Sequence, residues 1–147
     1  NERIETVFME SGPDGAIGHG YTYSGHPVGC AAALATLDVT FGQDLPGNAL
    51  ARGEQLMTSL KALQAEHEMI GDVRGKGLMV GIELVADRES KTPLDPQLGE
   101  ALADRVFAAG AMIRVTGNII IMSPPLVITE SEIDSLAQAL SVGFAGA

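Results

Sequence analysis

The residues best suited to chemistry gather near the start of the chain, between Gly18 and Pro27. This segment, Gly18-His19-Gly20-Tyr21-Thr22-Tyr23-Ser24-Gly25-His26-Pro27, holds two aromatic, two hydroxyl and two histidine side chains just before a predicted helix. Backbone N–H groups, a threonine hydroxyl and the positive end of a helix can together bind an anion, and phosphate is the ligand that such sites most often hold. A packed loop without a ligand explains the same residues equally well, so both interpretations stay open from the chemistry alone.

Two other segments resemble known motifs, a nucleotide-binding glycine-rich loop and a zinc site, but each lacks residues that its motif requires. In Arg74-Gly75-Lys76-Gly77, the lysine is followed by glycine rather than the Ser or Thr of a phosphate-binding P-loop, and the glycine spacing does not fit a dinucleotide fingerprint. A tight turn leading into a strand is the simpler interpretation. His19, His26 and Cys30 lack the fourth ligand and close pairing of a zinc site, so we expect no metal.

Composition restricts the classes of partner. The chain has 147 residues, of which 46% are hydrophobic, so it can bury a core. A formal net charge of -10 argues against binding to nucleic acid and to anionic membranes. Cys30 is the only cysteine, which excludes an internal disulfide and favours the cytoplasm. We expect no membrane span and no signal peptide, and the first residue is not methionine, which we interpret as a sign of missing upstream residues.

The remaining pattern predicts an α/β fold in which helices pack on a small, mostly antiparallel sheet. Residues 4–9 fit either a short strand or the end of a helix, and residues 11–26 form a long loop. Thr129, with Glu132 three residues later, is typical of a capping box. The other elements follow from helical or alternating spacing: helices at 28–41, 49–67, 97–109 and after 129, a turn at 73–77, and strands at 78–85, 112–115 and 118–122.

Three segments together resemble one enzyme family. Residues 19–33 are similar to the segment that follows the catalytic lysine in class III aminotransferases of fold type I. Their Tyr-Ser-Gly-His-Pro form resembles the ω-amino acid or amine:pyruvate branch, whereas the acetylornithine and GABA branches tend to have Gly-Asn-Pro. Residues 73–84 resemble the strand of the family's small domain, and residues 114–129 its closing stretch. The resemblance covers nearly the whole chain in the family's order.

The resemblance implies a role for three residues. Thr22 matches the threonine whose hydroxyl and backbone N–H hold the phosphate of pyridoxal 5'-phosphate (PLP) in the neighbouring subunit, and Tyr21 lies along the same edge. Arg114 matches the mobile arginine that grips a substrate carboxylate, a task that suits the paired donors of a guanidinium. Without the resemblance, a surface charge at a strand end would explain Arg114.

The resemblance also implies a C-terminal portion of a longer enzyme. The lysine that forms the Schiff base with PLP would lie upstream of Thr22 and before the first residue, and Lys61, Lys76 and Lys91 do not occupy its position. We expect residues 1–45 to be the remnant of the PLP-binding large domain with its linking helix. Residues 46–147 would then form the small domain.

In the complete enzyme, the implied reaction transfers an amino group from an amine or ω-amino acid to a keto acid such as pyruvate, in a homodimer with a cross-subunit phosphate contact. Two alternatives stay open. One is a non-catalytic α/β module for binding or dimerisation. The other is a different class III member, such as an acetylornithine or GABA-type aminotransferase or an aminomutase.

Overall fold

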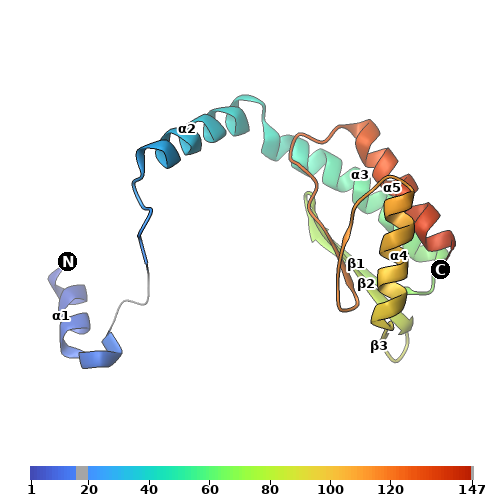
Figure 1. The fold of residues 1–147 in the computed structure, drawn as a ribbon, viewed down its shortest axis with the longest axis horizontal. Helices are drawn as coiled ribbons and strands as arrows, with labels where there is room; N and C mark the ends of the chain where they lie inside the picture. Colours follow the sequence, from blue (N-terminus) through green and yellow to red (C-terminus); the bar gives the residue numbers. More distant parts are fainter. Residues whose placement is uncertain (16–19, 147) are drawn as a thin grey trace. The chain divides into compact units, whose positions relative to one another are not determined.

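The computed structural model describes residues 1–15 and 20–146, which fall into two compact units, Asn1–Asp38 and Val39–Ala147. The first unit contains α1 (Glu2–Glu10), the short 3-10 helix η1 (Gly12–Gly15) and most of α2 (Pro27–Gly42) (Figure 1). Asn1 caps α1 by accepting a hydrogen bond from the Arg3 backbone N–H, so residues 4–9 belong to a helix and not to a strand. None of the described residues of α1 and α2 is buried.

The second unit is built on an antiparallel sheet. Its strands are β1 (Ile70–Lys76), β2 (Met79–Asp87), β3 (Thr92–Pro93), β4 (Arg114–Thr116) and β5 (Ile119–Met122). The strand order is β1-β2-β5-β4, with β3 paired to β2, and every pairing is antiparallel. The expected small antiparallel sheet is therefore confirmed.

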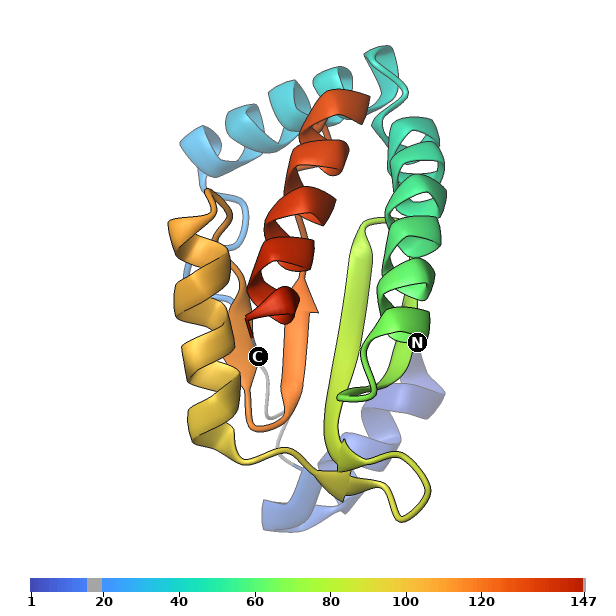
Figure 2. The same ribbon diagram turned by 90° about the vertical axis from the view of Figure 1, so that its right-hand side faces the viewer.

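Three helices cover one face of this sheet: α3 (Leu45–Glu66), α4 (Pro96–Ala108) and α5 (Glu130–Ala145) (Figure 2). Between residues 80 and 84 of β2, and throughout β5, buried residues that face the helices alternate with residues that are at least partly accessible, as the two-residue period of a strand requires. The alternation ends at Val85, which is buried like Leu84 before it. The core lies between the helices and this face: Leu56, Leu60, Val73, Val80, Ile82, Leu102, Val106, Ile120, Ile133, Leu140 and Phe144 are among its buried members.

Two helix starts show how local sequence fixes the elements. At α5 the capping box is confirmed, because the Glu132 backbone N–H donates to Thr129 Oγ1 at 3.3 Å and the Thr129 backbone N–H donates to Glu132 Oε2 at 2.8 Å. Helix α3 begins at Leu45, four residues earlier than predicted. Its N-cap is Asp44, whose carboxylate accepts from the Gly47 N–H, and Pro46 lies in its first turn.

The turn predicted over residues 73–77 is wrong. Residues 70–76 form strand β1, and the reversal is confined to Gly77 and Leu78, where Gly77 has a φ of +55°. The arginine, glycines and lysine of this stretch give it a low intrinsic preference for strand conformation. Its antiparallel pairing with β2 outweighs that preference. The turn contacts α3 closely, since a Cβ atom at Gly53 would lie 2.3 Å from the Gly77 carbonyl oxygen.

Candidate functional site

The loop before α2 is shaped by two successive turns. The Ser24 N–H donates to the Tyr21 carbonyl oxygen at 2.9 Å, and the His26 N–H donates to the Tyr23 carbonyl oxygen at 3.2 Å. Gly25 has a φ of +74°, a conformation that glycine adopts without the cost that a side chain adds. These turns bring the chain to Pro27, the first residue of α2, where a proline loses no helical hydrogen bond.

Thr22 lies within the first of these turns and is exposed. Within residues 1–15 and 20–146, neither its hydroxyl nor its backbone N–H is engaged in a hydrogen bond. Tyr21, directly before it, has 67% of its surface exposed. A hydroxyl and a backbone N–H on one residue, in a loop that leads into the start of a helix, can both donate to one edge of a phosphate group. His19, which belongs to the same predicted segment, lies outside the described residues.

Arg114 opens strand β4 in the second unit, directly opposite Ile121 of β5. It is exposed, and its guanidinium has no hydrogen-bond or ion-pair partner in the part of the chain that the structure describes. The other arginines of this unit are all engaged: Arg52 with Glu130, Arg74 with Asp72 and Glu83, Arg88 with Glu68 and the carbonyl oxygens of His67 and Ile70, and Arg105 with the Gly143 carbonyl oxygen. Arg114 is therefore available to an anion from outside.

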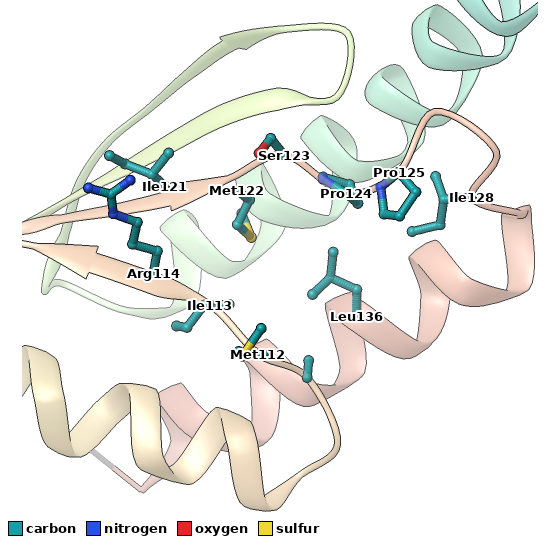
Figure 3. A pocket seen from close by; sticks show the side chains of 11 residues that line it. Met112, Ile113, Arg114, Ile121, Met122, Ser123, Pro124, Pro125, Ile128 and Leu136 are labelled. Carbon is teal, nitrogen blue, oxygen red and sulfur yellow. The ribbon is translucent and has the colours of Figure 1, made fainter. Parts of the chain in front are cut away.

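A cavity of about 560 Å³ lies beside Arg114. It forms where the chain before β4 and the chain after β5 separate, because Pro124 and Pro125 follow β5 and proline cannot donate to a sheet hydrogen bond. Arg114 and Ile121 lie at one end of the cavity, and Pro125, Ile128 and Leu136 lie at the other (Figure 3). Apart from Arg114 and Ser123, its lining side chains are apolar: Ala111, Met112, Ile113, Ile121, Met122, Pro124, Pro125, Ile128 and Leu136.

Comparison with known proteins identifies the family. The aminotransferase class-III profile matches residues 2–143. The crystal structure of an amine transaminase from an uncultivated Pseudomonas species, in its PLP-bound form, superposes with a TM-score of 0.85 at 44% identity, and the match covers 99% of this chain and 34% of that one. An uncharacterized aminotransferase of Sinorhizobium fredii, y4uB, is 46% identical over 143 residues, which are 92% of this chain and 30% of that protein. This chain belongs to the class-III aminotransferase family.

Other class-III relatives differ in their substrates. They include an adenosylmethionine-8-amino-7-oxononanoate aminotransferase of Methanocaldococcus jannaschii, 41% identical over 95% of this chain and 31% of that protein. A probable gamma-aminobutyrate transaminase of Oryza sativa is 38% identical over 92% of this chain and 28% of that protein. The class-III chain described here thus spans about a third of the length of the relatives it matches. Family membership at this level does not select one amine donor.

The lysines of this class-III chain are all on the surface of the second unit. Lys61 Nζ donates to Gln64 Oε1 at 3.0 Å on the outside of α3, Lys76 ends β1, and Lys91 lies in a turn with a φ of +57°. All three are exposed. Among the described residues, no group of His, Cys, Asp and Glu side chains could hold a metal ion, and no helix is long and apolar enough to cross a bilayer.

The sequence predicted Tyr21, Thr22 and Arg114 as site residues, which stay predictions, and it did not predict the cavity. Tyr21 and Thr22 lie together in the first unit, and Arg114 lies in the second. The cavity walls come from segments that are far apart in the chain, such as Met112, Pro124 and Leu136. Pro124-Pro125 was the available signal, since a proline pair directly after a strand marks a point where strand pairing must end.

Proposed function

We propose that the enzyme containing these residues transfers an amino group from an amine or ω-amino acid to a keto acid such as pyruvate, with PLP as its cofactor. The main support is the match to an amine transaminase at 44% identity and a TM-score of 0.85 over 99% of the chain. PLP supplies the electron sink that this chemistry requires. The lysine that bonds to the cofactor would come from the part of the enzyme that precedes Thr22.

Thr22 is proposed to hold the cofactor phosphate of the neighbouring subunit in a homodimer. Its hydroxyl and its backbone N–H can both donate, and neither is engaged within the described residues. Hydrogen bonds to a charged phosphate are stronger than those between neutral groups. Tyr21 would lie along the same edge of the phosphate site, where its exposed ring can cover the contact.

Arg114 is proposed to bind the carboxylate of the amino acid or keto acid. A guanidinium presents parallel N–H donors that match the two oxygens of a carboxylate. No carboxylate of the described residues forms an ion pair with Arg114, whereas Asp72 and Glu83 are both bound to Arg74, and this supports the role. An arginine without such partners can also move aside for an uncharged amine.

The arrangement of the whole enzyme follows the same proposal. Residues 1–45 would complete the PLP-binding large domain and carry its linking helix, and residues 46–147 would form the small domain. We place the enzyme in the cytoplasm, which suits a single, exposed cysteine. An acetylornithine or GABA-type activity, an aminomutase and a non-catalytic module are the alternatives that experiment must separate.

The test is amino transfer by the complete enzyme, with PLP added and either pyruvate or 2-oxoglutarate as acceptor. A panel should contain 1-phenylethylamine, β-alanine, 4-aminobutyrate and N-acetylornithine as donors. Alanine formation from 1-phenylethylamine or β-alanine is the expected result. Transfer only from 4-aminobutyrate or N-acetylornithine to 2-oxoglutarate would move the enzyme to another branch. Binding of PLP without transfer from any of these donors would contradict the proposed reaction.

A further inference from the structure

One side chain of α3 holds the stretch of chain that connects β5 to α5. Asn48 Nδ2 donates to the Leu126 carbonyl oxygen at 2.7 Å and to the Ile128 carbonyl oxygen at 3.0 Å. Both acceptors are carbonyl oxygens, so the two hydrogens of the carboxamide nitrogen are both used. Asn48 therefore ties the start of α3 to a stretch that lies 78 to 80 residues further along the chain.

This connecting stretch, residues 123–128, has little else to fix its position. Pro124 and Pro125 follow strand β5 and lack the N–H that a sheet hydrogen bond needs. Inside the stretch, the Ile128 N–H donates to the Pro125 carbonyl oxygen at 2.9 Å. In the part of the chain that the structure describes, Asn48 provides the only side-chain hydrogen bonds to residues 123–128. The position of the stretch thus depends on Asn48.

The connecting stretch forms part of the wall of the cavity beside Arg114. Pro124, Pro125 and Ile128 contribute apolar lining, and Pro125 and Ile128 lie at the end away from Arg114 (Figure 3). Asn48 does not line the cavity. It acts on the cavity only through the stretch that it holds.

The part of the wall that α5 contributes is also held from α3. Gln55 Nε2 donates to the Glu130 carbonyl oxygen at 3.1 Å and to Asp134 Oδ1 at 2.7 Å, which fixes the start of α5. Gln55 follows Asn48 by seven residues, about two helical turns, so both carboxamides lie on the same side of α3. Leu136, which lines the cavity, follows directly in α5.

The lining of the cavity indicates what it accepts. Its volume of about 560 Å³ lies in the range of small-molecule sites, and Arg114 and Ser123 are its only polar lining residues. Met112 and Met122 also line it, and a methionine thioether adapts its shape and packs favourably against aromatic rings. A guanidinium at one end of an apolar cavity suits a molecule that has both a carboxylate and an apolar group.

We propose that Asn48 is a positioning residue for substrates that carry a carboxylate and an apolar group. The carboxylate binds Arg114, the apolar group lies in the cavity, and Asn48 holds the far wall in place to receive it. The substrate class is therefore an amino or keto acid with an alkyl or aryl substituent. The inference deepens the proposed function and rests on it, because it takes Arg114 to bind a substrate carboxylate.

The test compares two donors that differ only in an apolar group. β-Alanine and 3-amino-3-phenylpropanoate have the same spacing of carboxylate and amine, and the second adds a phenyl ring. In the complete enzyme, with PLP and saturating pyruvate, the ring should lower KM by about tenfold or more, because its burial is favourable. Asn48→Asp should raise KM for the phenyl donor by about tenfold. It should leave kcat for that donor and KM for β-alanine within about twofold of the wild-type values.

Gln64 provides the matched control. It is another carboxamide of α3 that donates to a backbone carbonyl oxygen, that of Gly71 at 3.1 Å, and it does not line the cavity. Gln64→Glu should leave both KM values within about twofold. Asn48→Ala removes the donors without adding a charge and should act like Asn48→Asp. The inference is overturned if Asn48→Asp raises KM for both donors by the same factor, or if Gln64→Glu has the same effect as Asn48→Asp.

Leu136→Phe tests the cavity without changing Asn48, so it keeps the inference testable if the Asn48 variants do not fold. The larger side chain narrows the cavity from α5. It should raise KM for the phenyl donor by about tenfold and leave KM for β-alanine within about twofold. An unchanged KM for the phenyl donor would show that the cavity does not take the apolar group.

Hydrogen exchange separates the positioning role from the proposed function, because it needs no amino transfer. In the complete enzyme, the backbone N–H groups of residues 126–129 should exchange about fivefold or more faster in Asn48→Asp than in Gln64→Glu. Equal exchange in the two variants would overturn the positioning role. An enzyme without amino transfer from any donor would contradict the proposed function, whatever the exchange shows. An active enzyme in which Asn48→Asp leaves the KM ratio of the two donors unchanged would contradict this inference alone.

Discussion

Arg114 and Arg74 lie in one row of the sheet but differ in their surroundings. Arg74 contacts two carboxylates, whereas Arg114 has no partner within the described residues. The first arrangement stabilises the sheet surface, and the second leaves a cation ready for a ligand. Substitutions at these positions should therefore affect different properties of the complete enzyme.

Replacing Arg114 should affect substrates according to their charge. Arg114→Gln in the complete enzyme should lower kcat/KM for β-alanine or pyruvate by about 10- to 100-fold, the size expected for hydrogen bonds to a charged group. The same variant should leave the half-reaction with 1-phenylethylamine nearly unchanged. Arg114→Lys, which keeps the charge but not the paired donors, should fall between the two. An equal loss of kcat/KM for donors with and without a carboxylate would contradict the proposal that Arg114 binds the substrate carboxylate.

The ion pair of Asp72 should make the free energy of unfolding depend on pH in the acid range. Its hydrogen bond with Arg74 lowers the pKa of the Asp72 carboxyl in the folded chain. A lowered folded pKa gives stability that is present above the carboxyl's ordinary value near pH 4 and is lost as pH falls through the folded pKa. Because the pair is half exposed, the effect should be small. Urea unfolding from neutral pH to about pH 3 should show a shallower loss for Asp72→Asn, and an unchanged slope would contradict the assignment.

At the scale of elements, close contacts between glycine backbones fix α3 against the β1–β2 turn. The Cβ atom of an alanine at residue 53 would overlap the backbone of Gly77, which cannot move as a flexible side chain can. Gly53→Ala should therefore lower the free energy of unfolding by ~1–3 kcal/mol. In the isolated 147-residue chain, the matched change Gly81→Ala should have little effect, because its Cβ atom meets only ordinary contacts. Urea denaturation of both variants compares them, and equal losses would contradict this packing.

The elements that sequence could predict are those with local boundary signals. Pro27 and Gly42 bound α2, and the Thr129 cap starts α5, so both helices were predicted closely. Strand β1 was missed because its pairing with β2, and not its composition, decides its conformation. The cavity beside Arg114 could not be predicted, since its walls meet only after folding. The roles of Tyr21, Thr22 and Arg114 stay predictions.

At the scale of the whole molecule, helix α2 indicates that the chain needs further protein around it. Val28 is 71% exposed, Leu34 64% and Phe41 72%, and no residue of the helix is buried. A helix that is apolar on all sides is normally enclosed by protein. The large domain and dimer of the proposed enzyme would supply that enclosure.

The most direct test of the cross-subunit account is complementation between two inactive subunits. One subunit carries Thr22→Val and keeps its Schiff-base lysine, and the other keeps Thr22 but has that lysine replaced. Thr22→Ser serves as a control that retains the hydroxyl. If Thr22 completes the neighbour's site, each mixed dimer contains one lysine with an intact phosphate contact, so PLP binding at that site and alanine formation should return. If mixed dimers stay as inactive as the Thr22→Val homodimer, Thr22 does not act across the interface, and the account is contradicted.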